Sequence, residues 1–354
     1  MSAADDDVDS AAPPFAMPAL LPWQQQPLRE WLGQRASWHH ATLLNGQAGL
    51  GSRRLALHLA QGLLCQTPDA ALACGRCDSC RLFAAGSHPD FRLLEREYDE
   101  KSARSADPRR RDAIVVDQIR ALIDNFVYLS AHLRVAKVVM IYLAEEMNPN
   151  AANALLKSLE EPPPDTYFIL VSHQPRRLAP TIISRCRLVP SPRPSVSEAA
   201  GWLQAQGAAD PQTLLAQAGG APLQALTMLS AEYQAERRRF LQRLADPRRL
   251  SVIGMGAEAE GGGRALRKER MQQWFDLLVT WSYDLAAVAG GLPPRYHPDY
   301  ALQLAQLGQA VAPRRILRYH RALLGDRVLL SHPLSQRLVA ENALHGYRSA
   351  VLGD

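Results

Sequence analysis

Short apolar runs alternate with helical stretches between residues 23 and about 190. Residues 41–45, 137–141 and 167–171 are rich in leucine, β-branched or aromatic side chains and are too short for helices, so we predict buried strands there. Apolar residues recur at helical spacing in residues 150–161, and three prolines end that helix. Strands that alternate with helices predict a parallel sheet covered on both faces, as in an α/β domain.

The pattern changes after the prolines at positions 190, 192 and 194, where the strand-like runs stop. Residues 195–229 predict a small helical bundle, and residues 237–250 predict a charged helix. We expect a loop in residues 254–263, because glycine is frequent there. The remaining residues, to position 354, predict helices only, and no internal repeat is found.

Two further segments are predicted to lack regular structure. Residues 95–112 are charged throughout and predict a solvated loop. Residues 1–18 are acidic and rich in alanine and proline, which is typical of a disordered extension. They lack the basic start and apolar stretch of a secretory signal. Since no run of about 18 apolar residues follows either, we expect a cytoplasmic protein that does not enter a membrane.

The composition is that of a protein with substantial hydrophobic cores. The chain has 354 residues, of which 47% are hydrophobic and 21% charged, enough for two or three domains of ~100–200 residues. A net charge of +5 and a pI near 9.0 permit contact with nucleic acid without requiring it, because such an excess is also typical of an ordinary solvated surface.

Four of the five cysteines form a cluster with the spacing C-x8-C-x2-C-x2-C, at Cys65, Cys74, Cys77 and Cys80. Two residues between ligands allow a tight turn to direct both thiolates at one metal ion. Four thiolates close a tetrahedral site, which favours structural zinc over catalytic zinc. An iron–sulfur cluster uses similar spacing and stays an alternative, whereas disulfides are disfavoured in a cytoplasmic protein.

The turn after the first predicted strand has the frame of a phosphate-binding loop, G-x-x-x-x-G-K-[ST], but lacks its chemistry. Gly46, Gly49 and Gly51 supply the glycines, whereas Ser52 stands in place of the lysine and Arg53 in place of the magnesium-binding hydroxyl. Taken alone, this could be a glycine-rich turn that arose by chance.

The second half of an ATPase site is altered as well. Tyr142 and Leu143 follow the second predicted strand, where acidic residues would coordinate magnesium and polarise water. Glu145 and Glu146 lie past the strand end and are expected to begin the next turn. The sequence therefore predicts a chain that does not hydrolyse ATP.

Several ordered motifs resemble those of bacterial clamp-loader subunits, which belong to the AAA+ proteins. Residues 153–163 read NALLKSLEEPP and resemble the NALLK-LEEPP signature of that family. Residues 184–186 match its Ser-Arg-Cys motif, and both residues 116–120 and the cysteine cluster fit the same pattern. The resemblance is good over residues 23–187, weak through the next helices and poor beyond residue 240.

The resemblance implies a three-part architecture that follows the N-terminal extension. A RecA-like AAA+ α/β domain would occupy residues 19–191, with an inserted zinc module at residues 65–80. A small helical lid would follow at residues 192–240, and an all-α collar domain that holds a ring together would occupy residues 241–354.

The family contains working ATPases, gamma and tau, and a companion that keeps the fold without the catalysis. The changes at Ser52 and Tyr142 favour the companion, as does Leu223 at the position of the lid arginine. In such a ring, Arg185, with Ser184 before it, resembles the arginine finger that enters a neighbour's ATP site. Cys186 is then expected to be a packed thiol.

The implied partners are gamma or tau, delta, the beta sliding clamp and primed DNA. No intrinsic ATPase activity is expected, although the assembly serves a DNA-directed DNA polymerase. One alternative is an active ATPase of the gamma or tau type, which would have to bind nucleotide. Another is a zinc-dependent nucleic-acid-binding protein. Against it, the cysteine cluster has few aromatic or basic neighbours.

Overall fold

Five parallel strands form one sheet in the order β2-β3-β4-β1-β5. The computed structural model describes residues 17–70, 72–97, 113–133, 135–331 and 335–353. The chain divides into two units, residues 2–198 and 199–354, which are treated one at a time below. Nearly all of the predicted N-terminal extension (1–18) and of the predicted charged loop (95–112) lies outside the described residues.

The three predicted strands are confirmed, and two more flank them. The predicted strands are β1 (Ala41–Asn45), β3 (Lys137–Tyr142) and β4 (Thr166–Ser172). All three lie in the interior of the sheet, with a strand on each side, which explains their largely apolar sequences. β2 (Phe91–Leu94) and β5 (Arg187–Pro190) form the two edges. At the carboxyl end of β1, Asn45 is paired with Ser172 on one side and Pro190 on the other.

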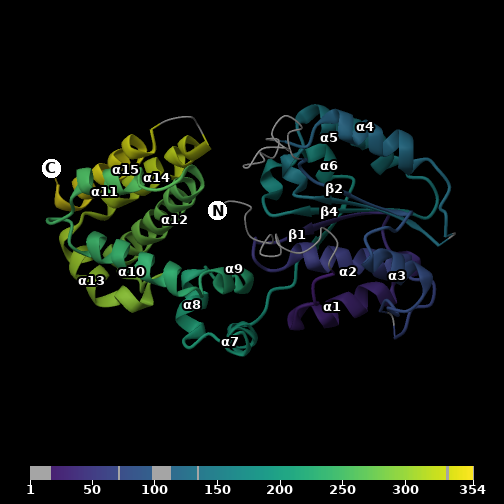
Figure 1. The fold of residues 1–354 in the computed structure, drawn as a ribbon, viewed down its shortest axis with the longest axis horizontal. Coiled ribbons are helices and arrows are strands. Elements are labelled where there is room, and N and C mark those ends of the chain that lie inside the picture. Colours follow the sequence, from purple (N-terminus) through teal and green to yellow (C-terminus); the bar gives the residue numbers. More distant parts are fainter. Residues whose placement is uncertain (1–16, 71, 98–112, 134, 332–334, 354) are drawn as a thin grey trace. The chain divides into compact units, whose positions relative to one another are not determined.

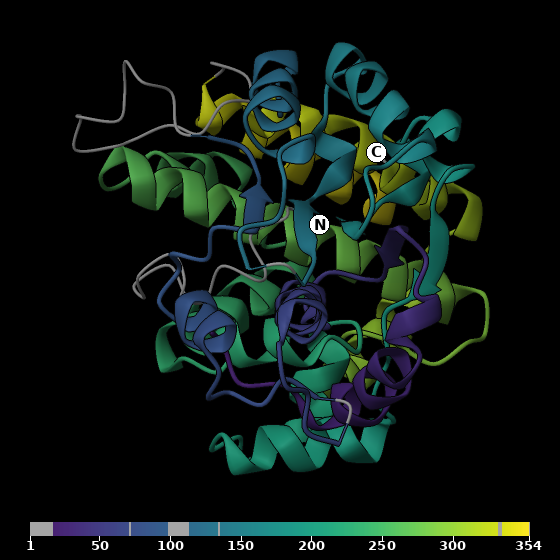
Figure 2. The ribbon, with the colours of Figure 1, turned by 90° about the vertical axis from the view of Figure 1, so that its right-hand side faces the viewer.

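Helices cover both faces of the sheet, as predicted (Figures 1 and 2). One face carries α1 (Pro22–Gly33), α2 (Ser52–Leu64) and α3 (Asp78–Ala84), with a short 3₁₀ helix η2 (Arg35–Ser37). The other face carries α4 (Val116–Leu122), the π-helix η3 (Ile123–Val127), α5 (Pro149–Glu160) and α6 (Pro180–Ile183). The 3₁₀ turns η4 (Ala144–Glu146) and η5 (Pro175–Arg177) follow β3 and β4.

The second unit contains helices only, among its described residues. The chain enters it along α7 (Val196–Ala205), which packs with α8 (Pro211–Gln217) and α9 (Pro222–Thr227) around a small core. A larger, separate core is formed by the remaining helices. These are α10 (Ala231–Ala245), α11 (Val252–Ala259), α12 (Arg264–Ala289), η6 (Pro298–Tyr300), α13 (Ala301–Ala310), α14 (Pro313–Asp326), η7 (Arg327–Ser331) and α15 (Gln336–Leu352).

The loop predicted in residues 254–263 is wrong over most of its length, because α11 runs from Val252 to Ala259. Ser251 caps this helix and accepts a hydrogen bond from the Gly254 amide at 3.2 Å. Gly256 faces α15, where an added Cβ would lie 2.5 Å from the side chain of Glu341. The glycine that suggested a loop thus permits two helices to pack closely.

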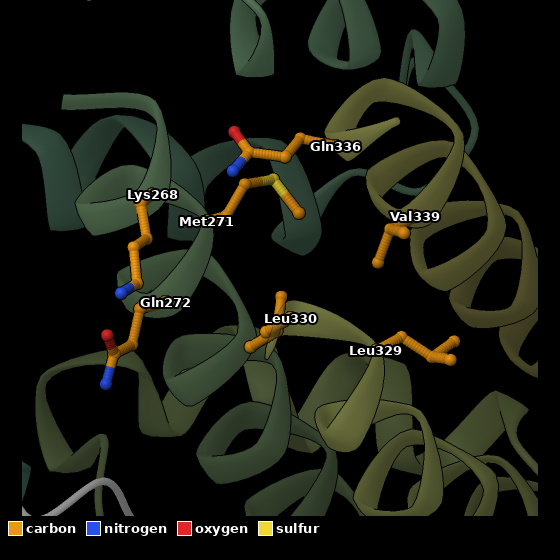
Figure 3. Close-up of a pocket in the computed structure, with 7 residues that line it drawn as sticks. All are labelled: Lys268, Met271, Gln272, Leu329, Leu330, Gln336 and Val339. Atoms are coloured by element: carbon orange, nitrogen blue, oxygen red, sulfur yellow. The ribbon is translucent and has the colours of Figure 1, made fainter. Parts of the chain in front are cut away.

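A small cavity of about 30 Å³ lies between α12, η7 and α15 in this unit (Figure 3). It is lined by Lys268, Met271, Gln272, Leu329, Leu330, Gln336 and Val339. A space of that size accommodates about one water molecule, so it is a packing defect and not a ligand site. No helix among the described residues is long and apolar enough to cross a membrane.

Candidate functional site

The phosphate loop predicted from the sequence joins β1 to α2 at the carboxyl edge of the sheet. Gly49 and Gly51 adopt positive φ angles of 78° and 82°, which only glycine accepts without strain, and α2 begins at Ser52. The backbone therefore keeps the turn that leads the first strand into a helix N-terminus, as in phosphate-binding loops.

Buried side chains from the end of β5 and from α1 contact this loop on two sides. Ser52, where the lysine would stand, is 1% exposed, and its Oγ lies 3.0 Å from Oγ of Ser191. Ser191, just after β5, approaches so closely that a Cβ on Gly46 would lie 2.5 Å from it. On the α1 side, Nε2 of Gln24 donates to the carbonyls of Leu50 at 3.1 Å and Gly51 at 2.8 Å. Neither Ser191 nor Gln24 was predicted to contact this loop.

The position of the magnesium-binding hydroxyl is taken by a guanidinium group. Arg53 lies over the ring of Tyr142, 5.4 Å from its centroid, and pairs with Glu95 at 3.5 Å. Tyr142 in turn ends β3, where an acidic residue would hold the metal ion. The Arg53 guanidinium thus lies beside the loop, held by an aromatic face and one carboxylate. Neither Arg53 nor Tyr142 supplies the hydroxyl or the carboxylate that would hold magnesium in a working site.

Glu145 and Glu146 lie in the 3₁₀ turn η4, as expected from their place past the strand end, and both have partners in the surrounding structure. One carboxylate oxygen of Glu145, which is 8% exposed, accepts hydrogen bonds from the amides of His173 at 2.9 Å and Gln174 at 3.1 Å. Glu146 pairs with Arg96 at 2.6 Å. Ser172, at the end of β4, accepts from the Gln174 amide at 3.2 Å. The contacts of Glu145 and Ser172 order the loop after β4.

Ser184 and Arg185 follow the short helix α6 on the opposite face of the sheet from α2. Ser184 is exposed, and its hydroxyl donates to the Thr181 carbonyl at 3.1 Å. The Arg185 side chain is 30% exposed, so its guanidinium lies at the surface. Cys186 packs against the core beside α5 and α6, and burial raises the pKa of its thiol to about 12, in agreement with a packed thiol.

Arg185 contacts the end of α5, a contact that the sequence did not suggest. Its Nε donates to Glu160 at 2.6 Å, and its terminal nitrogen Nη2 contacts the same carboxylate oxygen. The other terminal nitrogen donates to the Thr181 carbonyl at 2.9 Å. Glu160 and Arg185 belong to the two motifs that carry the clamp-loader resemblance, and the fold brings them together.

The four predicted metal ligands converge. The sulfurs of Cys65, Cys74, Cys77 and Cys80 all lie within 4.8 Å of one another. Four sulfurs that bind one zinc ion tetrahedrally would lie ~3.8 Å apart, given Zn–S bonds of ~2.3 Å. Cys65 directly follows α2 and Cys77 caps α3, so two helix ends position the ligands. The cluster could hold a metal ion such as zinc.

Hydrogen bonds around the sulfurs favour thiolates at the more exposed positions. Thr67 donates to Cys74 Sγ at 3.3 Å, and backbone amides donate to three of the sulfurs at 3.3–3.4 Å. The Thr67 hydroxyl, followed by backbone amides, lowers the pKa of Cys74 to about 5. Burial instead raises the pKa values of Cys65 and Cys80, so those two thiols gain most from a bound cation.

A parallel sheet whose first strand leads through a glycine-rich loop into a helix, with a four-cysteine cluster beside it, defines an AAA+-like α/β domain of the clamp-loader class. A family model described as DNA polymerase III, delta subunit, matches residues 26–194. The chain is 34% identical to DNA polymerase III subunit delta' of Escherichia coli K12, over 83% of this chain and 82% of that protein. It therefore belongs to the DNA polymerase III subunit delta' family.

Two further relatives carry the same name. The delta' subunit of Haemophilus influenzae is 36% identical over 83% of this chain and 84% of its own length. The delta' subunit of Pseudomonas aeruginosa is 49% identical over 59% of this chain. In that comparison the chain spans only 61% of the length of the relative it matches.

Proposed function

We propose that this chain is the non-hydrolysing subunit of a clamp loader and that it supplies Arg185 to the ATP site of a neighbouring subunit. One contrast carries the proposal. In the chain's own phosphate loop, Ser52 is buried against Ser191, and Arg53 and Tyr142 lie where magnesium ligands would stand. Ser184 and Arg185 of the finger motif instead lie at the surface.

The chemistry asked of Arg185 is electrostatic. In the neighbour's site, water attacks the γ-phosphorus of ATP, the bond to the β–γ bridging oxygen breaks, and ADP and inorganic phosphate leave. Negative charge on the transferred group is offset by a guanidinium placed against its oxygens, an effect worth ~10³–10⁵ in rate for well-positioned fingers. Arg185 neither forms a bond nor transfers a proton.

The cysteine cluster suits a structural zinc ion in this proposal. Four sulfur ligands leave no coordination position for substrate or water, and the ligands tie the end of α2 to the start of α3. The proposed role of zinc is to fix the module of residues 65–80 on the α/β domain.

The proposed partners are gamma or tau, which hydrolyse ATP, and delta, in an assembly that opens the beta sliding clamp and places it on primed DNA in the cytoplasm. Within this scheme residues 192–240 form the lid and residues 241–354 the collar. Two separate hydrophobic cores, of α7–α9 and of α10–α15, support a lid and a collar. Since α10 runs from Ala231 to Ala245 and packs in the second core, these cores favour a boundary near residue 230 over one at residue 240.

The test is ATP hydrolysis by the reconstituted loader, stimulated by clamp and primed DNA. Complexes with wild-type chain, Arg185→Ala or Arg177→Ala are compared. Arg177 is a matched control because it is an exposed arginine of the same surface segment without a role in the proposal. We expect Arg185→Ala to abolish hydrolysis at the adjacent site, a loss of ~10³-fold there, and Arg177→Ala to leave it unchanged.

Two results would contradict the proposal. One is undiminished hydrolysis by an intact Arg185→Ala complex. The other is binding and hydrolysis of Mg-ATP by the isolated wild-type chain, which would indicate an active ATPase. Tight DNA binding by the isolated chain that is lost on zinc removal would favour the nucleic-acid-binding alternative instead.

A further inference from the structure

In the isolated chain, the guanidinium of Arg185 is already bound. Its Nε and one terminal nitrogen contact Glu160, and its other terminal nitrogen donates to the Thr181 carbonyl at 2.9 Å and contacts the Ser184 hydroxyl at 3.3 Å. Four of the five N–H groups of the guanidinium therefore have acceptors within the chain. A γ-phosphate that bound the guanidinium through two N–H groups would have to displace at least one of these acceptors.

Glu160 is the last residue of α5. A carboxylate at a helix C-terminus faces the negative end of the helix dipole, which is unfavourable unless a cation lies close by. Arg185 is that cation. Glu160 and the α5 dipole therefore both attract the guanidinium toward the domain. The negative charge of Glu160 also offsets part of the positive charge that a γ-phosphate would otherwise meet.

We propose that Glu160 is a positioning residue that holds Arg185 withdrawn until the assembled loader exchanges the carboxylate for the neighbour's phosphate. This inference rests on the proposed role of Arg185 as a finger. The carboxylate and the phosphate compete for the same N–H donors, so Glu160 restrains hydrolysis in a loader that has not engaged clamp and DNA. Engagement, by bringing the γ-phosphate against Arg185, favours the exchange.

The expected size of the effect follows from the exposure of the pair. The side chains of Arg185 and Glu160 are 30% and 48% exposed, so water and salt screen their attraction. Exposed pairs of this kind shift an equilibrium by only about two- to fivefold. Glu160 therefore shifts the position of Arg185 only modestly and does not hold it fixed.

The experiment measures ATP hydrolysis by the reconstituted loader in the absence of clamp and DNA, with Glu160→Gln as the variant. Glutamine keeps the shape of the side chain but removes its charge. The matched control is Glu161→Gln, the next exposed carboxylate in the chain. Glu160→Ala serves as a second variant. Each complex is checked for subunit stoichiometry and melting temperature, and Arg185→Ala and Glu160→Gln/Arg185→Ala complexes are measured alongside.

We expect Glu160→Gln and Glu160→Ala to raise the unstimulated rate about two- to fivefold, Glu161→Gln to leave it unchanged, and the double variant to match Arg185→Ala. A merely structural role would not raise a rate. If Arg185→Ala loses stimulated hydrolysis but neither Glu160 variant raises the unstimulated rate, the proposed restraint by Glu160 is refuted, while the role of Arg185 as a finger stands. If Arg185→Ala has no effect in an intact complex, the finger itself is refuted.

Discussion

Replacing Arg237 with methionine should destabilise the helical unit substantially. Arg237 lies on α10 and is 1% exposed, although it carries a full charge. Its two terminal nitrogens donate to the two carboxylate oxygens of Asp299 at 2.6 and 2.9 Å, and one also donates to Nδ1 of His297 at 2.9 Å. These contacts tie α10 to the segment before α13.

The magnitude follows from which groups stay buried. Removing one partner of a buried ion pair costs about 3–5 kcal/mol, because the other charge is left without compensation. The Asp299 side chain is 32% exposed and can regain water, whereas His297 is 1% exposed and loses a donor outright. We therefore expect the lower end of the range, about 3 kcal/mol, or a fall in melting temperature of roughly 6–12 °C.

The assay is urea unfolding followed by tryptophan fluorescence, with hydrogen exchange of the α12 amides used to assign the transition to this unit. Arg238→Met is the control, because Arg238 is its exposed neighbour on the same helix, and we expect it to change the free energy of unfolding by less than ~0.5 kcal/mol. An Arg237→Met loss below about 1 kcal/mol would refute the reasoning, since a loss that small is typical of exposed pairs.

Three other outcomes are expected. Cys77→Ser should reduce bound zinc from one ion per chain to none, and it should lower the melting temperature of the N-terminal unit. Chelation of zinc from the wild-type chain should have the same two effects. Metal analysis measures the bound zinc, and calorimetry measures the melting temperature. Ser52→Lys should not create Mg-ATP binding, because Tyr142 supplies no carboxylate for magnesium. The variant should also be less stable, because the buried contact with Ser191 is broken. Saturable binding of Mg-ATP in a nucleotide titration would contradict this prediction. Burial, and then Arg237, hold the pKa of His297 well below its usual 6.5, so the unfolded chain takes up a proton first as pH falls. The free energy of unfolding should therefore decrease below about pH 6.5 by up to ~1.4 kcal/mol per pH unit from this group, and His297→Gln should remove that share of the slope.

The central strands could be predicted from the sequence and the edge strands could not, for a physical reason. β3 and β4 are covered on both faces, so nearly every position is apolar. β2 and β5 have four residues each, and Arg92 and Arg187 are exposed on them. Their pairing depends on strands far away in the chain, which no local pattern reports.

The candidate sites show the same division between local and distant information. The spacing from Cys65 to Cys80 was enough to predict a convergent cluster, because a tight turn determines most of its geometry. The contact between Glu160 and Arg185 crosses 25 positions, and Ser191 reaches Ser52 across 139. Those contacts exist only once the sheet brings β1 beside β5 and α6 against α5.

The central claim, that Arg185 acts in a neighbour's ATP site, is tested most directly by a single-turnover experiment. Loader complexes with wild-type chain or Arg185→Ala are charged with ATP, mixed with clamp and primed DNA, and followed for rapid release of phosphate. Our account predicts that the variant complex loses the rapid phase of one site, the one beside this chain, while ATP binding at all sites is preserved. A rapid phase of unchanged rate and amplitude, in a complex of unchanged composition, would contradict it.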